Sequence, residues 1–134
     1  MSAFCFIDQV TEVQPGESVT AFFRLNGNEE FLLDHFDGFP VMPGVLQLET
    51  LKQVALKLLE SSDSSKVFYT MSSAEEMKFG QFVKPGDTLK AFVRLVKTEK
   101  QTRFFEGRLD LVDAVSGSLK GKTLTALFQM VPLA

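Results

Sequence analysis

The sequence contains a single cysteine, Cys5, and no tryptophan. An intrachain disulfide is therefore excluded, and nothing in the composition requires an oxidising compartment. The first residues lack the basic region and the long apolar region of a signal peptide, and no apolar run approaches the roughly 18 residues that a membrane span needs. These absences together predict a soluble cytoplasmic protein.

Dense basic runs interleaved with aromatic residues are also missing, which argues against nucleic-acid binding. The charge is nevertheless uneven. Residues 1–77 hold 4 Lys or Arg against 12 Asp or Glu, whereas residues 78–134 hold 10 against 5. The second half could offer a basic face to an acidic protein or a phosphate-bearing ligand, or its charges could simply interleave with the others in the folded chain.

Phenylalanine, in contrast, is abundant, with 14 residues in a chain of 134 that is 45% hydrophobic. This length predicts one domain over residues 1–134, large enough to bury a core without disulfides or a metal. The phenylalanines would either pack that core or line a tunnel for an acyl chain. A Phe-packed core is the simpler explanation, because apolar rings pack well in any protein interior.

The pattern of apolar residues predicts one long helix among strands. Apolar residues recur at helical spacing from Val45 to about Glu60, and Pro43 suits the first helical position. Residues 18–25 alternate in the manner of a half-buried strand, with Val19, Ala21, Phe23 and Leu25 on one face. After the helix, strands are predicted near residues 67–72, 79–83, 89–95, 105–111 and 124–130. We therefore expect an α+β fold, in which a curved antiparallel β-sheet wraps around a long central helix.

The stretch before this helix contains the only histidine, His35. Pro40 and Pro43 stiffen the loop, and Gly44 lies at the start of the helix, where unpaired backbone N–H groups and the helix dipole could bind a developing oxyanion. An imidazole beside such a site suits proton abstraction next to a thioester carbonyl. The alternative is a structural or surface histidine.

Glu49 is the carboxylate nearest to the start of the helix. Steps of 100° per residue place it at the edge of the apolar arc, close to Gln53. It is either a solvated residue in contact with Gln53 or a general acid, and the acid role requires burial, which a second subunit could supply. Lys52, within reach at i+3, would favour the ionised carboxylate and so oppose the acid role.

The run from His35 to Glu49 resembles the signature of the 3-hydroxyacyl-[acyl carrier protein] dehydratases, His-Phe-Pro-Gly-x-Pro-x-Met-Pro-Gly-Val-Leu-x-x-Glu. Residues 78–89 are similar to that family's Lys-Phe-Arg-Arg-Pro-Val-x-Pro-Gly-Asp-x-Leu stretch, and residues 6–10 to its Leu-Ile-Asp-Arg-Val. The sequence departs from the pattern at Asp34, where the family has Gly, and at Asp37, where it has Pro. It also departs at Lys52, where a small apolar residue is usual, and at residues 80–81, where Gly-Gln replaces Arg-Arg.

The resemblance implies a hotdog fold, with dimers that hold two active sites at their interface and often assemble as trimers of dimers. His35 of one subunit would remove the C2 proton of a 3-hydroxyacyl thioester, and Glu49 of the other would protonate the departing hydroxyl, giving a trans-2-enoyl thioester. The substrate would arrive on the phosphopantetheine of an acyl carrier protein, without a metal or redox cofactor. The residues expected to bind it are Phe36, Pro43, Gly44, Val45, Gln53 and Phe79.

Two other functions stay open, because one fold can host several activities. A hotdog thioesterase would need a carboxylate to position a water molecule, and Glu49 could supply it. A non-catalytic acyl-binding or assembly subunit would bind its ligand without turnover, with Asp34 and Lys52 as signs of divergence from the active enzymes.

Overall fold

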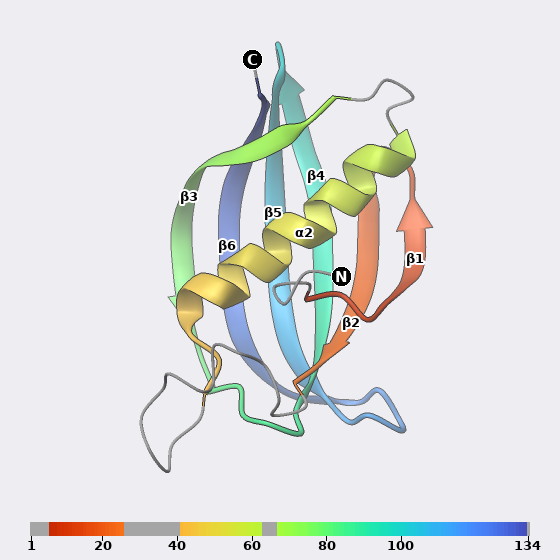
Figure 1. Cartoon of the computed structure of the whole chain (residues 1–134), viewed down its shortest axis with the longest axis vertical. Helices are drawn as coiled ribbons and strands as arrows, with labels where there is room; N and C mark the ends of the chain where they lie inside the picture. The colour runs from red at the N-terminus through yellow and green to blue at the C-terminus, as the bar shows by residue number, and fades with distance from the viewer. Residues whose placement is uncertain (1–5, 26–40, 63–66, 134) are drawn as a thin grey trace.

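The computed structural model describes residues 6–25, 41–62 and 67–133. Its elements, in chain order, are β1 (Gln9–Gln14), β2 (Ser18–Arg24), α2 (Gly44–Ser62), β3 (Tyr69–Phe79), β4 (Thr88–Glu99), β5 (Thr102–Val112) and β6 (Leu119–Pro132). The strands form one antiparallel sheet in the order β1-β2-β4-β5-β6-β3. Helix α2 lies across one face of this curved sheet (Figure 1). The predicted α+β architecture is therefore confirmed.

The core lies between the helix and the sheet. The predicted inward face of β2 is buried, and so are alternate residues of β4, β5 and β6. On the helix, the buried residues recur at the predicted spacing: Leu51, Val54, Ala55, Leu58 and Leu59. Leu51 packs against β5, since a Cβ atom placed on Gly107 would lie only 3.0 Å from its Cδ1. Glycine at this position lets the helix approach β5.

The phenylalanines divide between the core and the surface. Phe6 packs edge-on against Phe23 with ring centroids 5.5 Å apart, and Phe105 stacks on Phe128 at 5.4 Å. These four side chains are buried, as a Phe-containing core requires. Three others, Phe68, Phe79 and Phe82, are exposed in the part of the chain that the structure describes.

The strand predictions were wrong at two places. Two strands, and not one, precede the helix, and β1 was missed because its side chains are mostly exposed and show no alternation. One strand, β3, runs from Tyr69 to Phe79 through the gap between the strands predicted at 67–72 and 79–83, and residues 80–83 are not a strand. The register of β3 shifts between Met71 and Ser73 and again between Glu75 and Lys78, where Glu76 has a φ of 49°. Such bulges break the period of two on which strand prediction depends.

The helix also differs from its prediction in its start and its surroundings. The carbonyl of Pro43 accepts hydrogen bonds from the backbone N–H of Leu46 and Gln47, so Pro43 caps the helix and Gly44 is its first residue. The sheet covers only one side of α2 and does not enclose it on nearly all sides. Val45 is 72% exposed, and Glu60 is also exposed. No helix in the described ranges has the length and apolar character to cross a membrane.

The segment after β3 stays attached to the sheet although it is not a strand. The N–H groups of Gly80 and Gln81 donate to the carbonyls of Thr123 and Lys122 on β6, each over 2.9 Å. A Cβ atom on Gly80 would overlap the backbone carbonyl oxygen of Lys122. Because a backbone atom cannot rotate away as a side chain can, this close approach requires glycine.

We therefore expect Gly80→Ala to lower the free energy of unfolding by about 1–3 kcal/mol through steric overlap. Urea denaturation of both proteins measures the change. Gly117→Ala is the matched control, since Gly117 has a φ of 74° and open space around it, so its cost of about 1 kcal/mol comes from backbone conformation alone. A Gly80→Ala protein as stable as the wild type would contradict the overlap.

Candidate active site

The start of helix α2 presents unpaired hydrogen-bond donors. The N–H groups of Leu46 and Gln47 turn back to the Pro43 carbonyl, over 3.0 and 3.1 Å. Within the described residues, no acceptor faces the N–H groups of Gly44 and Val45. The positive end of the helix dipole lies at the same place, so these groups can stabilise negative charge on a bound oxygen.

The ring of Phe79 lies directly against this helix start. A Cβ atom on Gly44 would lie 2.7 Å from Cε1 of Phe79 and 2.9 Å from its Cζ. Phe79 ends β3 and is 54% exposed, so its ring forms an accessible apolar wall beside the Gly44 N–H. A glycine at the first position of the helix leaves room for this ring.

Backbone and side-chain hydrogen bonds anchor Met42, which lies two residues before the start of the helix. The N–H of Met42 donates to the carbonyl of Val83 over 2.8 Å, which ties the helix start to the segment after β3. The side chain of Gln47 then donates from Nε2 to the carbonyl of Met42 over 3.3 Å. Met42 and Gln47 are both buried, at 2% and 4% exposure.

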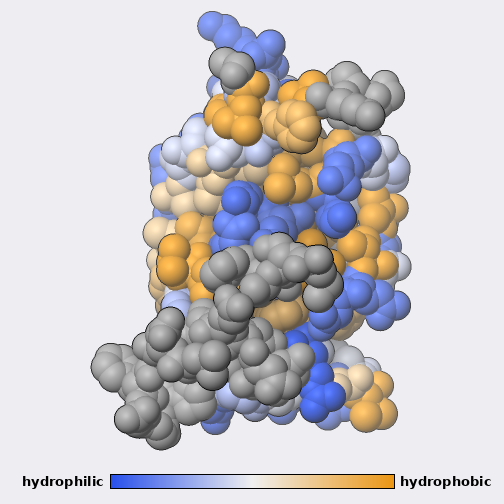
Figure 2. All heavy atoms as spheres, in the orientation of Figure 1, coloured by the Kyte–Doolittle hydropathy of each residue, from blue (hydrophilic) through white to orange (hydrophobic). Residues whose placement is uncertain are grey.

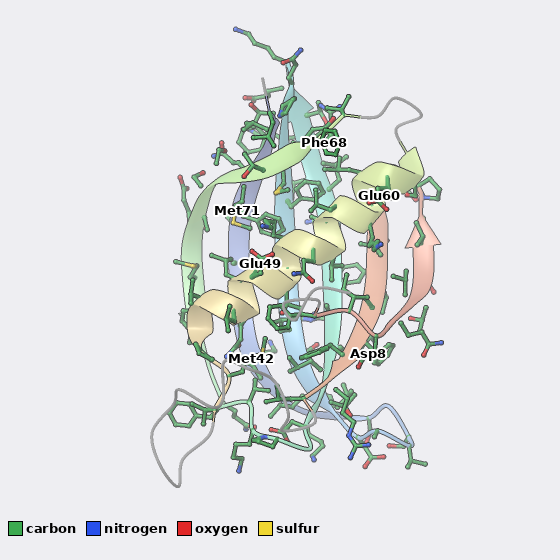
Figure 3. The ribbon with its side chains drawn as sticks, in the orientation of Figure 1. Asp8, Met42, Glu49, Glu60, Phe68 and Met71 are labelled. Carbon is green, nitrogen blue, oxygen red and sulfur yellow. The ribbon has the colours of Figure 1, made fainter. Side chains whose placement is uncertain are left out.

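Glu49 belongs to a line of polar contacts on the same helix. Its Oε1 pairs with Nζ of Lys52 at 2.8 Å, and its Oε2 accepts a hydrogen bond from Nε2 of Gln53 at 3.0 Å. The Oε1 of Gln53 accepts the backbone N–H of Phe6 at 2.8 Å, which links the N-terminal segment to the helix. The Glu49 side chain is 31% exposed. In Figure 3 it lies between Met71 of β3 and Met42.

This arrangement bears on what Glu49 can do in a single chain. The contacts with Gln53 at i+4 and with Lys52 at i+3 are those that the spacing predicts. Both partners donate to the carboxylate, Lys52 to Oε1 and Gln53 to Oε2. In the single chain, both oxygens of Glu49 therefore act as hydrogen-bond acceptors.

The structure brings together most of the predicted site. Pro43, Gly44 and Phe79 meet at the helix start, with the exposed Val45 beside them, and Glu49 and Gln53 follow on the same helix. Glu49 lies five positions after Gly44, which corresponds to a rise of about 7.5 Å along the helix axis. His35 and Phe36 lie outside the described residues, so their predicted roles are untested.

Sequence reasoning missed Gln47 and Val83, which anchor Met42. A signal for Gln47 was present, because it falls four residues before Leu51 and seven before Val54, within the apolar stripe of the helix. A polar residue at such a position is buried and therefore needs a partner. Nothing local marks Val83, since its carbonyl meets Met42 only through the tertiary fold.

The surface above the helix is mixed in character. Figure 2 shows hydrophilic atoms gathered over the middle of this face, with hydrophobic atoms toward its margins. The exposed apolar side chains near the end of β3 are Met77, Phe79 and Phe82, and Val45 is exposed at the helix start.

Solved structures define the fold class. The structure described as the dehydratase heterocomplex ApeI:P from Xenorhabdus doucetiae matches with a TM-score of 0.71 and 14% identity, over 100% of this chain and 86% of that chain. A hypothetical thioesterase with coenzyme A from Streptococcus pneumoniae matches with a TM-score of 0.70 and 11% identity, over 94% and 88%. The fold is thus the hotdog fold, which dehydratases and thioesterases share.

Sequence comparison then gives the family. The ApeI-like family, described as ApeI dehydratase, matches residues 11–117. The 3-hydroxyacyl-[acyl-carrier-protein] dehydratase FabZ of Ehrlichia chaffeensis is 44% identical over 103 residues, covering 77% of this chain and 71% of the relative. The FabZ of Levilactobacillus brevis is 42% identical over 93 residues, which cover 69% of this chain and 63% of that relative, less than two thirds of its length. This chain belongs to the ApeI-like and FabZ family of dehydratases.

The ion pair between Glu49 and Lys52 generates a prediction. Lys52→Ala removes the ammonium group that holds Oε1 of Glu49 at 2.8 Å and frees the carboxyl group to reach a substrate, so turnover of a 3-hydroxyacyl thioester should stay at the wild-type level or rise. The free energy of unfolding should change by less than about 1 kcal/mol, because half-exposed ion pairs contribute little. Steady-state kinetics and urea denaturation measure the two quantities.

A matched control lies on the same helix. Lys57 pairs with Glu60 at the same i+3 spacing, over 3.8 Å and further from the helix start. Lys57→Ala should change neither quantity appreciably. A collapse of turnover in Lys52→Ala, but not in Lys57→Ala, would show instead that Lys52 takes part in the reaction.

Proposed function

We propose that this protein dehydrates a 3-hydroxyacyl thioester to the trans-2-enoyl thioester. The chain belongs to a dehydratase family, and the start of helix α2 carries the proposal. There the N–H of Gly44, which has no partner among the described residues, lies beside Phe79, and Glu49 follows on the same helix. The same helix can therefore offer a donor to the thioester carbonyl and a carboxyl group to the 3-hydroxyl of one substrate.

In the proposed reaction, His35 removes the proton from C2 of the substrate. The thioester carbonyl oxygen gains negative charge, which the Gly44 N–H stabilises by a hydrogen bond. The C3–O bond breaks as Glu49 delivers a proton to the departing hydroxyl, so that water leaves and a C2–C3 double bond forms. We infer no metal or redox cofactor, since each step is a proton transfer or an elimination.

We propose that two copies of the chain complete the site. Strand β3 is one edge of the sheet, eleven residues long, and carries the exposed Met77 and Phe79. An exposed, partly apolar edge strand is a template for pairing with another strand. A second copy at this edge would cover apolar surface near Glu49, which would favour the neutral acid that the mechanism needs. Such dimers could assemble further as trimers of dimers.

We propose an acyl carrier protein as the source of the substrate, on the basis of the names of the relatives. Their role in 3-hydroxyacyl-[acyl-carrier-protein] dehydration suggests fatty-acid biosynthesis or a specialised pathway with the same chemistry. We also propose that residues 1–134 form a single domain. We place its action in the cytoplasm, since the single cysteine, Cys5, gives no sign of an oxidising compartment.

One observation favours a second function, thioester hydrolysis. The carboxylate of Glu49 is paired with Lys52 at 2.8 Å, and an ionised carboxylate suits a base that positions a water molecule better than it suits an acid. We rank this second because the family of the chain is that of the dehydratases.

The experiment follows the enoyl-thioester absorbance when purified protein meets a synthetic trans-2-enoyl thioester in water, while a thiol reagent reports hydrolysis. Dehydration is reversible, so a dehydratase also hydrates the double bond. We expect the absorbance to fall without thiol release. Release of thiol would support the hydrolase instead.

His35→Ala is the control for this assay. It should abolish hydration and keep the unfolding midpoint close to that of the wild type, because it removes the proposed base and no side chain of the described core. Full activity in His35→Ala would contradict the assignment of the base. If the wild-type protein leaves the enoyl-thioester absorbance unchanged over a range of acyl chain lengths, the result would contradict the proposed function and favour a binding subunit.

A further inference from the structure

Gln47 is a buried polar residue beside the proposed site that the mechanism does not use. It lies in the first turn of α2 with 4% of its surface exposed. Its Nε2 donates to the carbonyl of Met42 over 3.3 Å. Since a carbonyl only accepts hydrogen bonds, the amide nitrogen and not the oxygen must face Met42, and the orientation of the side chain is determined.

The other end of the same amide has no partner. The Oε1 of Gln47 is buried and makes no hydrogen bond in the described structure. A buried acceptor without a partner costs stability, and a long apolar side chain of similar shape would avoid that cost. The bond that Nε2 makes to the Met42 carbonyl is offset in part by the cost of the unpaired Oε1, so the net contribution of Gln47 to folding stability should be small.

The contact of Gln47 with Met42 acts on the helix start. The Met42 carbonyl belongs to the peptide that joins Met42 to Pro43, and the next peptide carries the Gly44 N–H. On its other side, the N–H of Met42 is tied to the carbonyl of Val83 over 2.8 Å. With both groups of Met42 held, the peptides that follow have little freedom to rotate, and the Gly44 N–H keeps one direction.

We propose that Gln47 is a positioning residue that fixes the direction of the Gly44 N–H toward the substrate oxygen. This inference rests on the proposed function, in which that N–H stabilises the charge that develops on the thioester oxygen. Small displacements of such a donor lower the rate of the chemical step strongly, because its hydrogen bond is strongest in the transition state. The free energy that the unpaired Oε1 costs is then the consequence of a catalytic requirement.

The test replaces the amide by apolar groups of similar length in Gln47→Met and of related shape in Gln47→Leu. Hydration of a trans-2-enoyl N-acetylcysteamine thioester gives kcat and KM, and thermal denaturation gives Tm. We expect kcat to fall about 10- to 100-fold in both variants, in the range seen when a charge-stabilising donor is displaced or removed. KM should stay within about threefold. Tm should change little, because removal of the unpaired Oε1 offsets in part the cost of leaving the Met42 carbonyl without its donor.

Thr50→Val is the matched control. Thr50 is also buried on α2, and its Oγ1 donates to the carbonyl of Leu46 over 3.0 Å, so the variant likewise removes a hydrogen bond from a buried side chain to a backbone carbonyl. The hydrogen bond of Thr50 does not involve Met42. We therefore expect Thr50→Val to change Tm but to leave kcat at the wild-type value.

Hydrogen exchange adds a readout that does not depend on activity. The amide of Met42 should exchange about tenfold faster in Gln47→Met, while the amide of Ala55 in the middle of the helix keeps its rate. If the wild-type protein shows no turnover but the Met42 amide still exchanges faster in Gln47→Met, the proposed function is refuted. The anchoring of Met42 by Gln47 is then still supported.

Two results would overturn the inference itself. One is a kcat within twofold of the wild type in both apolar variants, together with unchanged exchange at Met42. The other is a loss of kcat accompanied by a large decrease of Tm or a failure to fold in both variants, because Gln47 would then be required for the stability of the fold and not only for the direction of the donor.

Discussion

A backbone hydrogen bond from the N–H of Met42 to the carbonyl of Val83, over 2.8 Å, holds the start of helix α2 to the segment that follows β3. Val83 follows the segment that Gly80 and Gln81 tie to β6, so this bond connects the first turn of the helix to the far strands of the sheet. The close contact of Leu51 with Gly107 holds the middle of the helix to β5. Because both attachments restrain the helix, the positions of its first N–H groups and of Glu49 are set by the fold.

The proposed mechanism asks more of Glu49 than its contacts in the single chain provide. The mechanism needs Glu49 to donate a proton, whereas Lys52 and Gln53 both donate to its carboxylate. We propose that a second copy at the β3 edge removes this difference by excluding water from the carboxyl group. Glycine at residue 80, where the resembled sequence pattern has arginine, has a structural basis, because a side chain there would meet the Lys122 carbonyl.

Local patterns predicted the parts of the structure that depend on local spacing. A regular period predicted the long helix α2, although not its exact start, and the buried face of β2. Helical spacing also predicted the contacts of Glu49 with Lys52 and Gln53. Strand β3 was not predicted as one element, because its bulges interrupt the alternation. The packing of Phe79 on Gly44 and the bond from Gln47 to Met42 join residues only in the folded chain, so no spacing rule reveals them.

The central claim is that this site adds or removes water at C3 of an acyl thioester and leaves the thioester intact. The most direct test supplies a synthetic trans-2-enoyl thioester in water enriched in the heavy oxygen isotope and locates the label by mass spectrometry. The account predicts the label in the 3-hydroxyl group of an intact thioester. A label found only in the carboxylate of a free acid would contradict it and would identify the carboxylate of Glu49 as a candidate base for hydrolysis.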